Sequence, residues 1–329
     1  MAGNGNSMSL LQLELPNLEF VELRGVEINY NVSGFSPARM LFRIPELLIS
    51  VWKEHYQLKQ IILEHNIQLV ISDNRYGCWS RNVKSVFITH QLAIKLPELW
   101  SWLSKPVNAV NHYFIRKFDE CWVPDEKNQP YLSGELSHGI NELDNVKFVG
   151  ALSRFYLAKE QNEIQQFDVL VILSGPEPQR SILEVTLISE LEKTDMTVLI
   201  IRGKPDDGLN PVPIGKIVFN NHLSAESIRS HLLKSKYIIC RSGYSSLMDL
   251  AAVGRSAIII PTPGQTEQEY LAEYHHQMGN HFYVLQEKPD LTNAFEGVKA
   301  CKLLKLENIS LAVAIKRIFQ DKEILKDNN

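Results

Sequence analysis

The sequence predicts an α/β protein built on parallel sheets. Short apolar runs rich in Val and Ile, at 168–173, 196–202 and 237–240, alternate with segments whose apolar residues recur every three or four positions. The first pattern is typical of buried parallel strands and the second of amphipathic helices. Several runs end in loops that contain Gly, Ser or Pro before a helix begins. Ligands of open α/β sheets bind at such carboxyl ends, so these loops are the candidate site.

The same patterns place the elements in order along two halves of the chain. In the first half we expect a helix at 7–15, a strand at 19–23, a loop at 25–35 and a helix at 38–63, followed by strands at 69–71, 83–89, 120–124 and 146–149. In the second half we expect strands at 168–173, 196–202, 216–219, 237–240, 256–260 and 281–285, with helices at 182–191, 224–234, 245–251, from 265, at 289–304 and at 310–325.

Length and composition indicate two soluble domains. A chain of 329 residues exceeds one typical domain, and we expect an N-terminal domain at 1–153, a polar linker at 154–166 and a C-terminal domain at 167–329. The net charge of −4 argues against nucleic acid binding, which favours basic surfaces. The four cysteines (Cys78, Cys121, Cys240, Cys301) form no CxxC pair, so neither a zinc site nor a disulfide framework is indicated. No apolar run reaches the ~20 residues of a membrane-spanning helix, and no signal peptide is visible. We therefore expect a cytoplasmic location, with attachment to a membrane surface as the alternative.

The stretch 237–273 carries the clearest ligand signal. Gly243 follows a predicted strand and permits close approach of a ligand to the backbone, while Ser242, Ser245 and Ser246 supply hydroxyls. The free N–H groups at the start of the next helix, with the positive end of its dipole, suit a phosphate or diphosphate. The alternative is that Ser245 merely caps the helix.

The strings RSGYSSLMDLAAVG and IIIPTPGQTEQEYLAE resemble the C-terminal domain of family 28 glycosyltransferases. These are GT-B enzymes, with two Rossmann-like doubly wound parallel-sheet domains facing across a cleft, and they include the transferase that adds N-acetylglucosamine to the peptidoglycan lipid intermediate. The resemblance is strong over about 165–290 and weaker over the N-terminal half. It implies a nucleotide-diphosphate sugar as donor, UDP-linked by preference, and no further cofactor.

The resemblance assigns donor-side residues. The diphosphate and ribose would contact Gly175, Arg180, Arg241, Ser242, Gly243, Ser245, Ser246 and Asp249. The base pocket would include Phe219, Asn221 and Leu223, and the donor sugar would meet Gln265, Glu267, Gln268 and Glu269. Glu269 and Ala272 stand where the family commonly has Gln and Asn, which leaves the identity of the sugar open. Arg180 could equally be a solvated arginine in the first turn of its helix.

On the acceptor side, polar residues follow two predicted strands of the first half. Asp73 and Arg75 follow one strand, and His90 and Gln91 follow the next, where the family also has a His. His90 is a candidate for acceptor contact or proton transfer, or else it orders a loop by hydrogen bonding. Compared with the family, the chain lacks the first strand, its glycine-rich loop and the first helix, with the His regarded there as the base. Either the given sequence starts late or the domain manages with one strand fewer.

The resemblance implies a hexosyltransferase that acts on an unknown acceptor, with N-acetylhexosaminyl as one option for the transferred group. We expect this enzyme to be metal-independent. No Asp-x-Asp motif stands at a strand end to hold a metal. Two alternatives stay open: a non-catalytic subunit that binds a nucleotide sugar or a partner chain, and a nucleotide-sugar epimerase that uses Glu177, Glu267 and Glu269. The pair Trp100 and Trp102, with Lys95, Lys105, Arg116 and Lys117 nearby, suits either a peripheral contact with lipid or a core.

Overall fold

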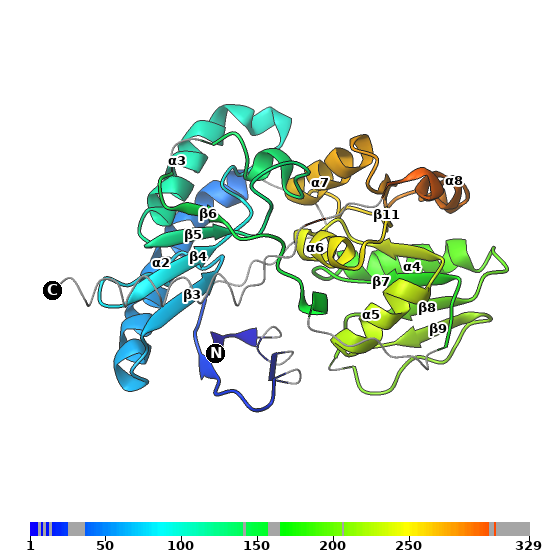
Figure 1. The fold of residues 1–329 in the computed structure, drawn as a ribbon, viewed down its shortest axis with the longest axis horizontal. Coiled ribbons are helices and arrows are strands. Elements are labelled where there is room, and N and C mark those ends of the chain that lie inside the picture. The colour runs from blue at the N-terminus through cyan, green and yellow to red at the C-terminus, as the bar shows by residue number, and fades with distance from the viewer. Residues whose placement is uncertain are drawn as a thin grey trace.

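The computed structural model describes residues 1–5, 8, 11, 12, 15–25, 37–140, 143–156, 165–205, 207–302 and 306, without the side chains of 37–45 and 47 (Figure 1). The expected terminal helix at 310–325, most of the expected linker and parts of the expected helix at 7–15 lie outside these residues. Two large parallel sheets organise the described part. Among the described residues, no helix is both long and apolar enough to cross a membrane.

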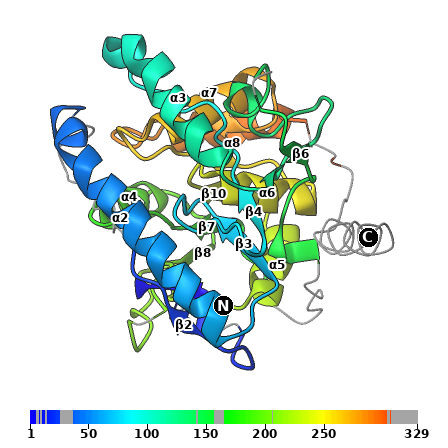
Figure 2. The same ribbon diagram turned by 90° about the vertical axis from the view of Figure 1, so that its left-hand side faces the viewer.

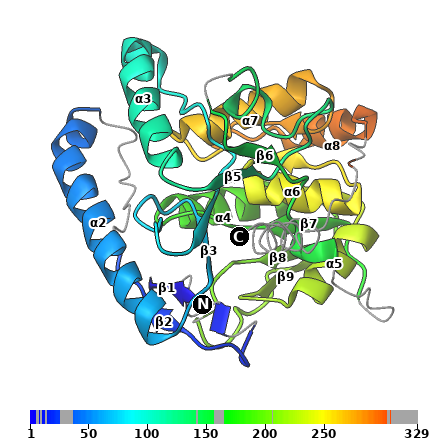
Figure 3. The same cartoon turned by 60° about the vertical axis from the view of Figure 1, so that its left-hand side comes forward.

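The N-terminal sheet has four parallel strands in the order β3-β4-β5-β6. They are β3 (Leu69–Asp73), β4 (Lys84–Ile88), β5 (Glu120–Val123) and β6 (Val146–Phe148). The helix α2 (Pro37–Glu64) precedes β3, while the 3-10 helix η1 (Glu98–Leu103) and α3 (Ser104–Ile115) connect β4 to β5. Both α2 and α3 lie at the left of Figures 1 and 3, and Figure 2 looks at that side of the molecule.

The C-terminal sheet has six parallel strands in the order β12-β11-β10-β7-β8-β9. They are β7 (Val169–Ile172), β8 (Val198–Ile201), β9 (Ile217–Asn220), β10 (Tyr237–Cys240), β11 (Ile258–Ile259) and β12 (Phe282–Tyr283). The helices are α4 (Gln179–Leu191), α5 (Ala225–Lys234), α6 (Tyr244–Val253), α7 (Thr266–Gln277) and α8 (Leu291–Gly297). Two buried apolar clusters share the residues of β7, with Leu170 in one and Val169 and Val171 in the other, as expected for a strand covered on both faces.

This strand order determines where a ligand would bind. The chain runs outward from β7 through β8 to β9, then returns to place β10 on the other side of β7. The order therefore reverses between β7 and β10, which is the switch point of a Rossmann-type sheet. Gly175 follows β7 and Arg241–Gly243 follow β10, so both predicted donor loops lie at the carboxyl ends beside this point.

The structure differs from the sequence-based elements at both ends. No strand was expected before 19–23, yet Ala2–Gly3 form β1, which pairs in parallel with β2 (Val21–Glu22) in a separate two-stranded sheet. The helix expected at 289–304 is shorter, because α8 ends at Gly297 and only a 3-10 turn, Val298–Ala300, follows it. Cys301 already has extended backbone angles.

The two large sheets are connected through α6 and α7. The Tyr244 hydroxyl donates to the Pro124 carbonyl oxygen at 2.7 Å, and the His275 imidazole donates to the Leu132 carbonyl oxygen at 2.8 Å. The Thr266 hydroxyl donates to the Lys95 carbonyl oxygen at 2.8 Å. Side chains of the C-terminal half thus bond to loops at the carboxyl ends of β4 and β5.

Candidate functional site

The N-terminus of α6 opens onto free space. Gly243 is the N-cap of α6, with φ −68° and ψ 144°, and a Cβ added to it would meet no heavy atom within 4 Å. In the first turn Ser245 is exposed and Ser246 is half-buried. The first backbone N–H groups of a helix lack intrahelical partners, so this end of α6 can accept an anion.

Arg241 and Ser242 have structural contacts instead of facing that space. The Arg241 side chain, 1% exposed, donates to the carbonyl oxygens of Pro261 at 3.0 Å and Gln179 at 2.9 Å. The Ser242 hydroxyl donates to the carbonyl oxygen of Gln268 at 2.8 Å. Burial lowers the pKa of Arg241 to about 10, which leaves the guanidinium charged at neutral pH. These two residues hold the loops of the site together, which differs from the direct diphosphate contact that we expected.

Buried polar atoms without a partner gather around the same loops. In the described part of the chain they include Arg241 Nε, Thr262 Oγ1 and Gln286 Oε1. Gln179 links Gln286 to Arg241. Its side-chain Oε1 accepts a hydrogen bond from the Gln286 amide, and its backbone carbonyl oxygen accepts one from the Arg241 guanidinium. Gly175, with φ +98°, lies opposite, and a Cβ on it would come 3.7 Å from Thr262 Oγ1. Buried polar groups normally have partners, so these atoms suit a polar ligand or water.

Arg180 belongs to a buried ion network. Its guanidinium donates to Glu177 Oε1 at 2.7 Å and Glu184 Oε2 at 2.8 Å, and Arg202 donates to the other oxygen of Glu184 at 2.5 Å. Arg180 is therefore neither the expected diphosphate ligand in this arrangement nor a solvated arginine. The spacing of Arg180 and Glu184, four residues apart on one helix, is the signal in the sequence that favours this pair.

Of the three residues expected at the base pocket, Phe219 and Leu223 pack in or against apolar clusters and Asn221 holds a loop. The Phe219 side chain is buried in an apolar cluster of the C-terminal half, so only its backbone is left for the expected contact with a base. The Asn221 amide donates to the carbonyl oxygens of Asp207 at 2.9 Å and Leu209 at 3.1 Å, and thereby fixes the loop after β8. Leu223 is half-buried against the other apolar cluster.

Asp249 contacts the segment that leads out of the N-terminal half. Its carboxylate accepts a hydrogen bond from the Ser153 hydroxyl at 2.6 Å and lies 3.5 Å from Arg154 Nε. Asp249 lies in α6, and part of the hydrogen-bonding capacity of its carboxylate is already used. A ribose would share this carboxylate with Ser153.

The expected donor-sugar residues at the start of α7 mainly shape the preceding loop. Gln265 is the N-cap of α7, Gln268 Oε1 accepts from Thr262 N at 2.9 Å, and Glu269 Oε1 accepts from Gly264 N at 2.8 Å. Glu269, which replaces the common Gln, thus holds a backbone N–H of the loop 262–264. Glu267 is the exception, because its side chain contacts His90 and Gln91 of the N-terminal half.

Glu267 joins the acceptor-side residues. His90 Nε2 lies 2.7 Å from Glu267 Oε1, and the Gln91 amide donates to Glu267 Oε2. The His90 ring stacks on Tyr244, with ring centroids 4.0 Å apart and planes inclined by 7°. Tyr244 directly follows Gly243, so the structure brings His90 next to the open end of α6. Sequence reasoning selected His90 and Glu267 separately and missed their contact.

Asp73 and Arg75, the other two residues named with His90 on the acceptor side, have different surroundings. Arg75 donates to Glu54 Oε1 at 3.1 and 3.0 Å and to the Leu23 carbonyl oxygen at 2.8 Å, so it joins β3 to α2 and not to an acceptor. Asp73 remains accessible to solvent, but surrounding protein raises its carboxyl pKa, against the attraction of His90.

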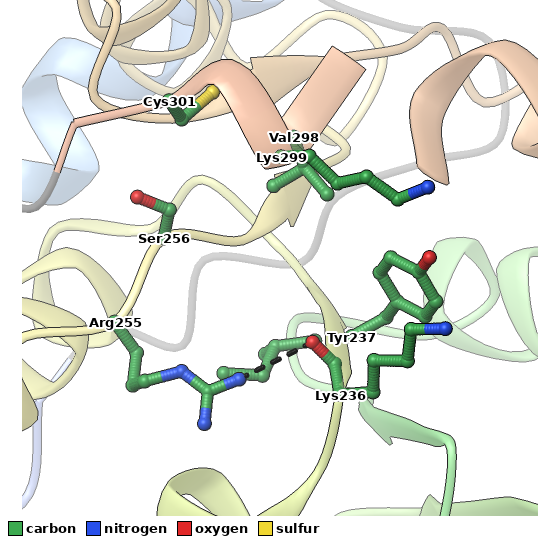
Figure 4. A pocket seen from close by; sticks show the side chains of 8 residues that line it. Lys236, Tyr237, Arg255, Ser256, Val298, Lys299 and Cys301 are labelled. Atoms are coloured by element: carbon green, nitrogen blue, oxygen red, sulfur yellow. Dashed lines mark hydrogen bonds between the residues drawn. The ribbon is translucent and has the colours of Figure 1, made fainter. Parts of the chain in front are cut away.

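A separate cavity of about 300 Å³ lies at the opposite, amino-terminal edge of the C-terminal sheet (Figure 4). Its lining residues are Lys236, Tyr237, Ile238, Arg255, Ser256, Val298, Lys299 and Cys301. The Arg255 guanidinium there donates to the carbonyl oxygens of Leu232 and Ser235, at the end of α5. The described residues contain no group of three His, Cys, Asp or Glu side chains that could hold a metal.

Comparison with known proteins agrees with this architecture. Residues 179–325 match the glycosyltransferase family 28 C-terminal domain. No curated protein sequence matches the chain. The structure is similar to the glycosyltransferase of kitacinnamycin (TM-score 0.60, 13% identity, covering 90% of this chain and 82% of that one). It is also similar to CalG4, the calicheamicin glycosyltransferase (TM-score 0.55, 14% identity, covering 89% and 80%).

The fold is shared beyond transferases. A Listeria monocytogenes protein named as a UDP-N-acetylglucosamine 2-epimerase has a TM-score of 0.56 at 10% identity, covering 92% of this chain and 82% of that one. Identities this low establish the fold alone, whereas the family match, which covers residues 179–325 and thus less than half of the chain, supports a glycosyl-transfer function. Residues 179–325 of this chain match the glycosyltransferase family 28 C-terminal domain, and the chain shares the GT-B fold of the glycosyltransferases to which its structure is similar.

Proposed function

We propose that the chain transfers a hexosyl group, with N-acetylhexosaminyl as one option, from a UDP-sugar to an acceptor hydroxyl. The observation that carries the proposal is the open N-terminus of α6 at Gly243, at the switch point of a family 28 domain. A diphosphate there would be stabilised by backbone N–H groups and by the helix dipole. The same groups would stabilise the charge that develops on the leaving diphosphate, without a metal ion.

Titration of the purified chain with UDP, GDP and dTDP, and then with their sugar conjugates, tests the donor. We expect UDP to bind most tightly, and a UDP-sugar to release UDP when an acceptor or water is present. Binding without release would favour the non-catalytic subunit. Conversion of the UDP-sugar into a stereoisomer would favour the epimerase. No binding of any nucleotide would refute the proposal.

The substitution Gly243→Val should remove nucleotide binding and leave the fold intact. The added side chain points into space where the structure has no atoms, and a φ of −68° is accessible to any residue. A diphosphate bound at the α6 N-terminus would lose its close backbone approach. We expect the affinity for UDP to fall at least tenfold, about 1.4 kcal/mol, in a calorimetric titration.

Gly243→Ala is the graded control, with an intermediate affinity, and thermal unfolding of both variants should match the wild type. An unchanged affinity of the valine variant for UDP would contradict a diphosphate at this helix end.

We propose a peripheral lipid contact for a face formed by α2, η1 and α3, here called the aromatic face. Its exposed large apolar residues are Leu48, Ile49, Trp52, Tyr56 and Leu63 on α2, and Leu99, Trp102, Val110 and Tyr113 on η1 and α3. The two helices are bridged by Lys117, which lies over the rings of Trp79 and Tyr113, and Trp79 stacks on His55 of α2. Of the expected tryptophan pair, Trp102 is 70% exposed and Trp100 is half-buried.

The charges around the aromatic face favour an anionic lipid surface. Lys53, Lys59 and Lys105 are exposed on the same elements, as is Arg116 at the C-cap of α3. The exposed opposing charges are Glu46, Glu64 and Glu98, which leaves a small excess of positive charge. Exposed Trp and Tyr with neighbouring Lys suit the headgroup region of a bilayer.

Co-sedimentation with vesicles tests the lipid contact. The wild type should sediment with phosphatidylglycerol vesicles more than with phosphatidylcholine vesicles, and the variant Trp52→Ser with Trp102→Ser should stay in solution. Leu209→Ser is the control, since Leu209 is 95% exposed on the other half of the chain. Equal sedimentation of the tryptophan variant and the wild type would exclude the aromatic face.

A further inference from the structure

We propose that Glu267 is a positioning residue that fixes His90 as the base for the acceptor hydroxyl, with Nδ1 as the atom that takes the proton. This inference rests on the proposed glycosyl transfer. The two residues come from different halves of the chain, since His90 lies in the loop after β4 and Glu267 lies in the first turn of α7. Each half of the chain therefore supplies one part of the dyad.

The geometry assigns the proton on the ring. His90 Nε2 lies 2.7 Å from Glu267 Oε1, and a carboxylate only accepts hydrogen bonds, so Nε2 carries the hydrogen and Nδ1 has the lone pair. No described residue bonds to Nδ1. The ring is further held by stacking on Tyr244, and the His90 carbonyl oxygen accepts from the Ser137 hydroxyl at 2.6 Å.

The remaining contacts hold the carboxylate. Its second oxygen accepts from the Gln91 amide, and Thr266, the residue before Glu267, bonds through its hydroxyl to the Lys95 carbonyl oxygen at 2.8 Å. Both side chains stay partly accessible, His90 at 13% and Glu267 at 30%. A ring that is oriented yet reachable meets the first requirement for a general base.

The position also suits the chemistry. Tyr244, against which His90 stacks, is the residue after Gly243, so the ring lies beside the proposed diphosphate site. In the transfer, the acceptor oxygen forms a bond to the anomeric carbon while the bond from that carbon to the diphosphate oxygen breaks. The diphosphate leaves with the electron pair, and the hydroxyl proton moves to His90 Nδ1. The imidazolium so formed is stabilised by the Glu267 carboxylate.

The kinetic test compares His90→Gln and Glu267→Gln in turnover of the UDP-sugar that binds. A general base contributes about 10²–10⁴-fold, so we expect His90→Gln to lower kcat by that factor and Glu267→Gln to lower it by about 10-fold or more. The KM for the donor and the affinity for UDP should stay within about twofold, since neither residue holds the diphosphate. Glu267→Asp should recover part of the rate, and Glu273→Gln, an exposed carboxylate on the same helix, should behave as wild type.

A second measurement does not depend on turnover. Nitrogen-15 NMR of histidine-labelled protein, with His90 assigned by its absence in His90→Gln, should show the Nε2–H tautomer under alkaline conditions. The Nδ1–H tautomer, or a kcat of Glu267→Gln within twofold of wild type, would overturn the proposal. Failure of every nucleotide to bind would instead refute the glycosyl transfer, while the tautomer would still decide the arrangement of the pair.

Discussion

Replacing Glu184 by glutamine should lower the free energy of unfolding by about 3–5 kcal/mol, because it leaves the buried Arg180 and the half-buried Arg202 without their shared counter-charge. Glu184 is 7% exposed on α4, and its two oxygens accept from Arg180 and Arg202. Folded domains are stable by only about 5–15 kcal/mol, so this loss is a large fraction of the total. Chemical denaturation followed by circular dichroism measures it.

The control for this prediction is Glu190→Gln on the same helix. Glu190 is only partly buried and pairs with the exposed Lys193 at 2.6 Å, a contact expected to contribute less than about 1 kcal/mol. Similar losses for both substitutions would mean that the network around Glu184 behaves as a surface pair. Because Arg202 also donates to Asn221 Oδ1 at 2.9 Å, disruption should loosen the loop 207–210 as well.

Most of the two sheets could be predicted from the sequence because buried parallel strands have a strong local signal. The runs expected at 120–124, 168–173 and 237–240 contain the strands Glu120–Val123, Val169–Ile172 and Tyr237–Cys240. The length of α8 was overestimated, because apolar spacing alone does not show at which residue a helix ends. Strand order depends on contacts between distant segments and followed only from the structure.

The site was predicted less completely, because position along the chain does not tell which way a side chain points. Phe219 follows Ile217 on the same face of β9, and a period of two directs both into the core. Arg180 and Arg241 were expected to bind phosphate as cations, yet both are buried among partners in the protein. The contact of His90 with Glu267 spans 177 positions, beyond any spacing rule.

Stability should fall as the pH drops from about 6.5 toward 4, because two buried histidines stay neutral in the folded protein. His275 Nε2 donates to the Leu132 carbonyl oxygen, its Nδ1 accepts from Asn280, and His281 Nδ1 accepts from Ala257 N at 3.1 Å. Burial lowers the pKa of His275 to about 4, and burial with the nearby His275 lowers that of His281 to about 3.

The direction of this effect follows from proton binding. Above pH 6.5 both histidines are neutral whether the chain is folded or unfolded, and their contribution is complete. Below it the unfolded chain takes up two protons that the folded protein refuses, and the free energy of unfolding falls by about 1.4 kcal/mol per pH unit for each histidine. Carboxylates affect stability at lower pH. Burial alone would raise the pKa of Asp125, but hydrogen bonds from His138 and Ser133 outweigh it and lower the pKa, so this group reduces stability only below about pH 4.

Denaturation between pH 7 and 4.5 should therefore show a steep acid loss that the double substitution His275→Gln with His281→Asn flattens. Glutamine can keep the donor to the Leu132 oxygen and asparagine can keep the acceptor for Ala257 N, so the hydrogen bonds survive while titration is removed. His276→Gln, at the exposed neighbouring position of α7, should leave the slope unchanged. Because His275 bonds to Leu132 of the N-terminal half, protonation would act on the contact that connects the two sheets. A slope equal in the double variant and the wild type would assign the acid sensitivity to other groups.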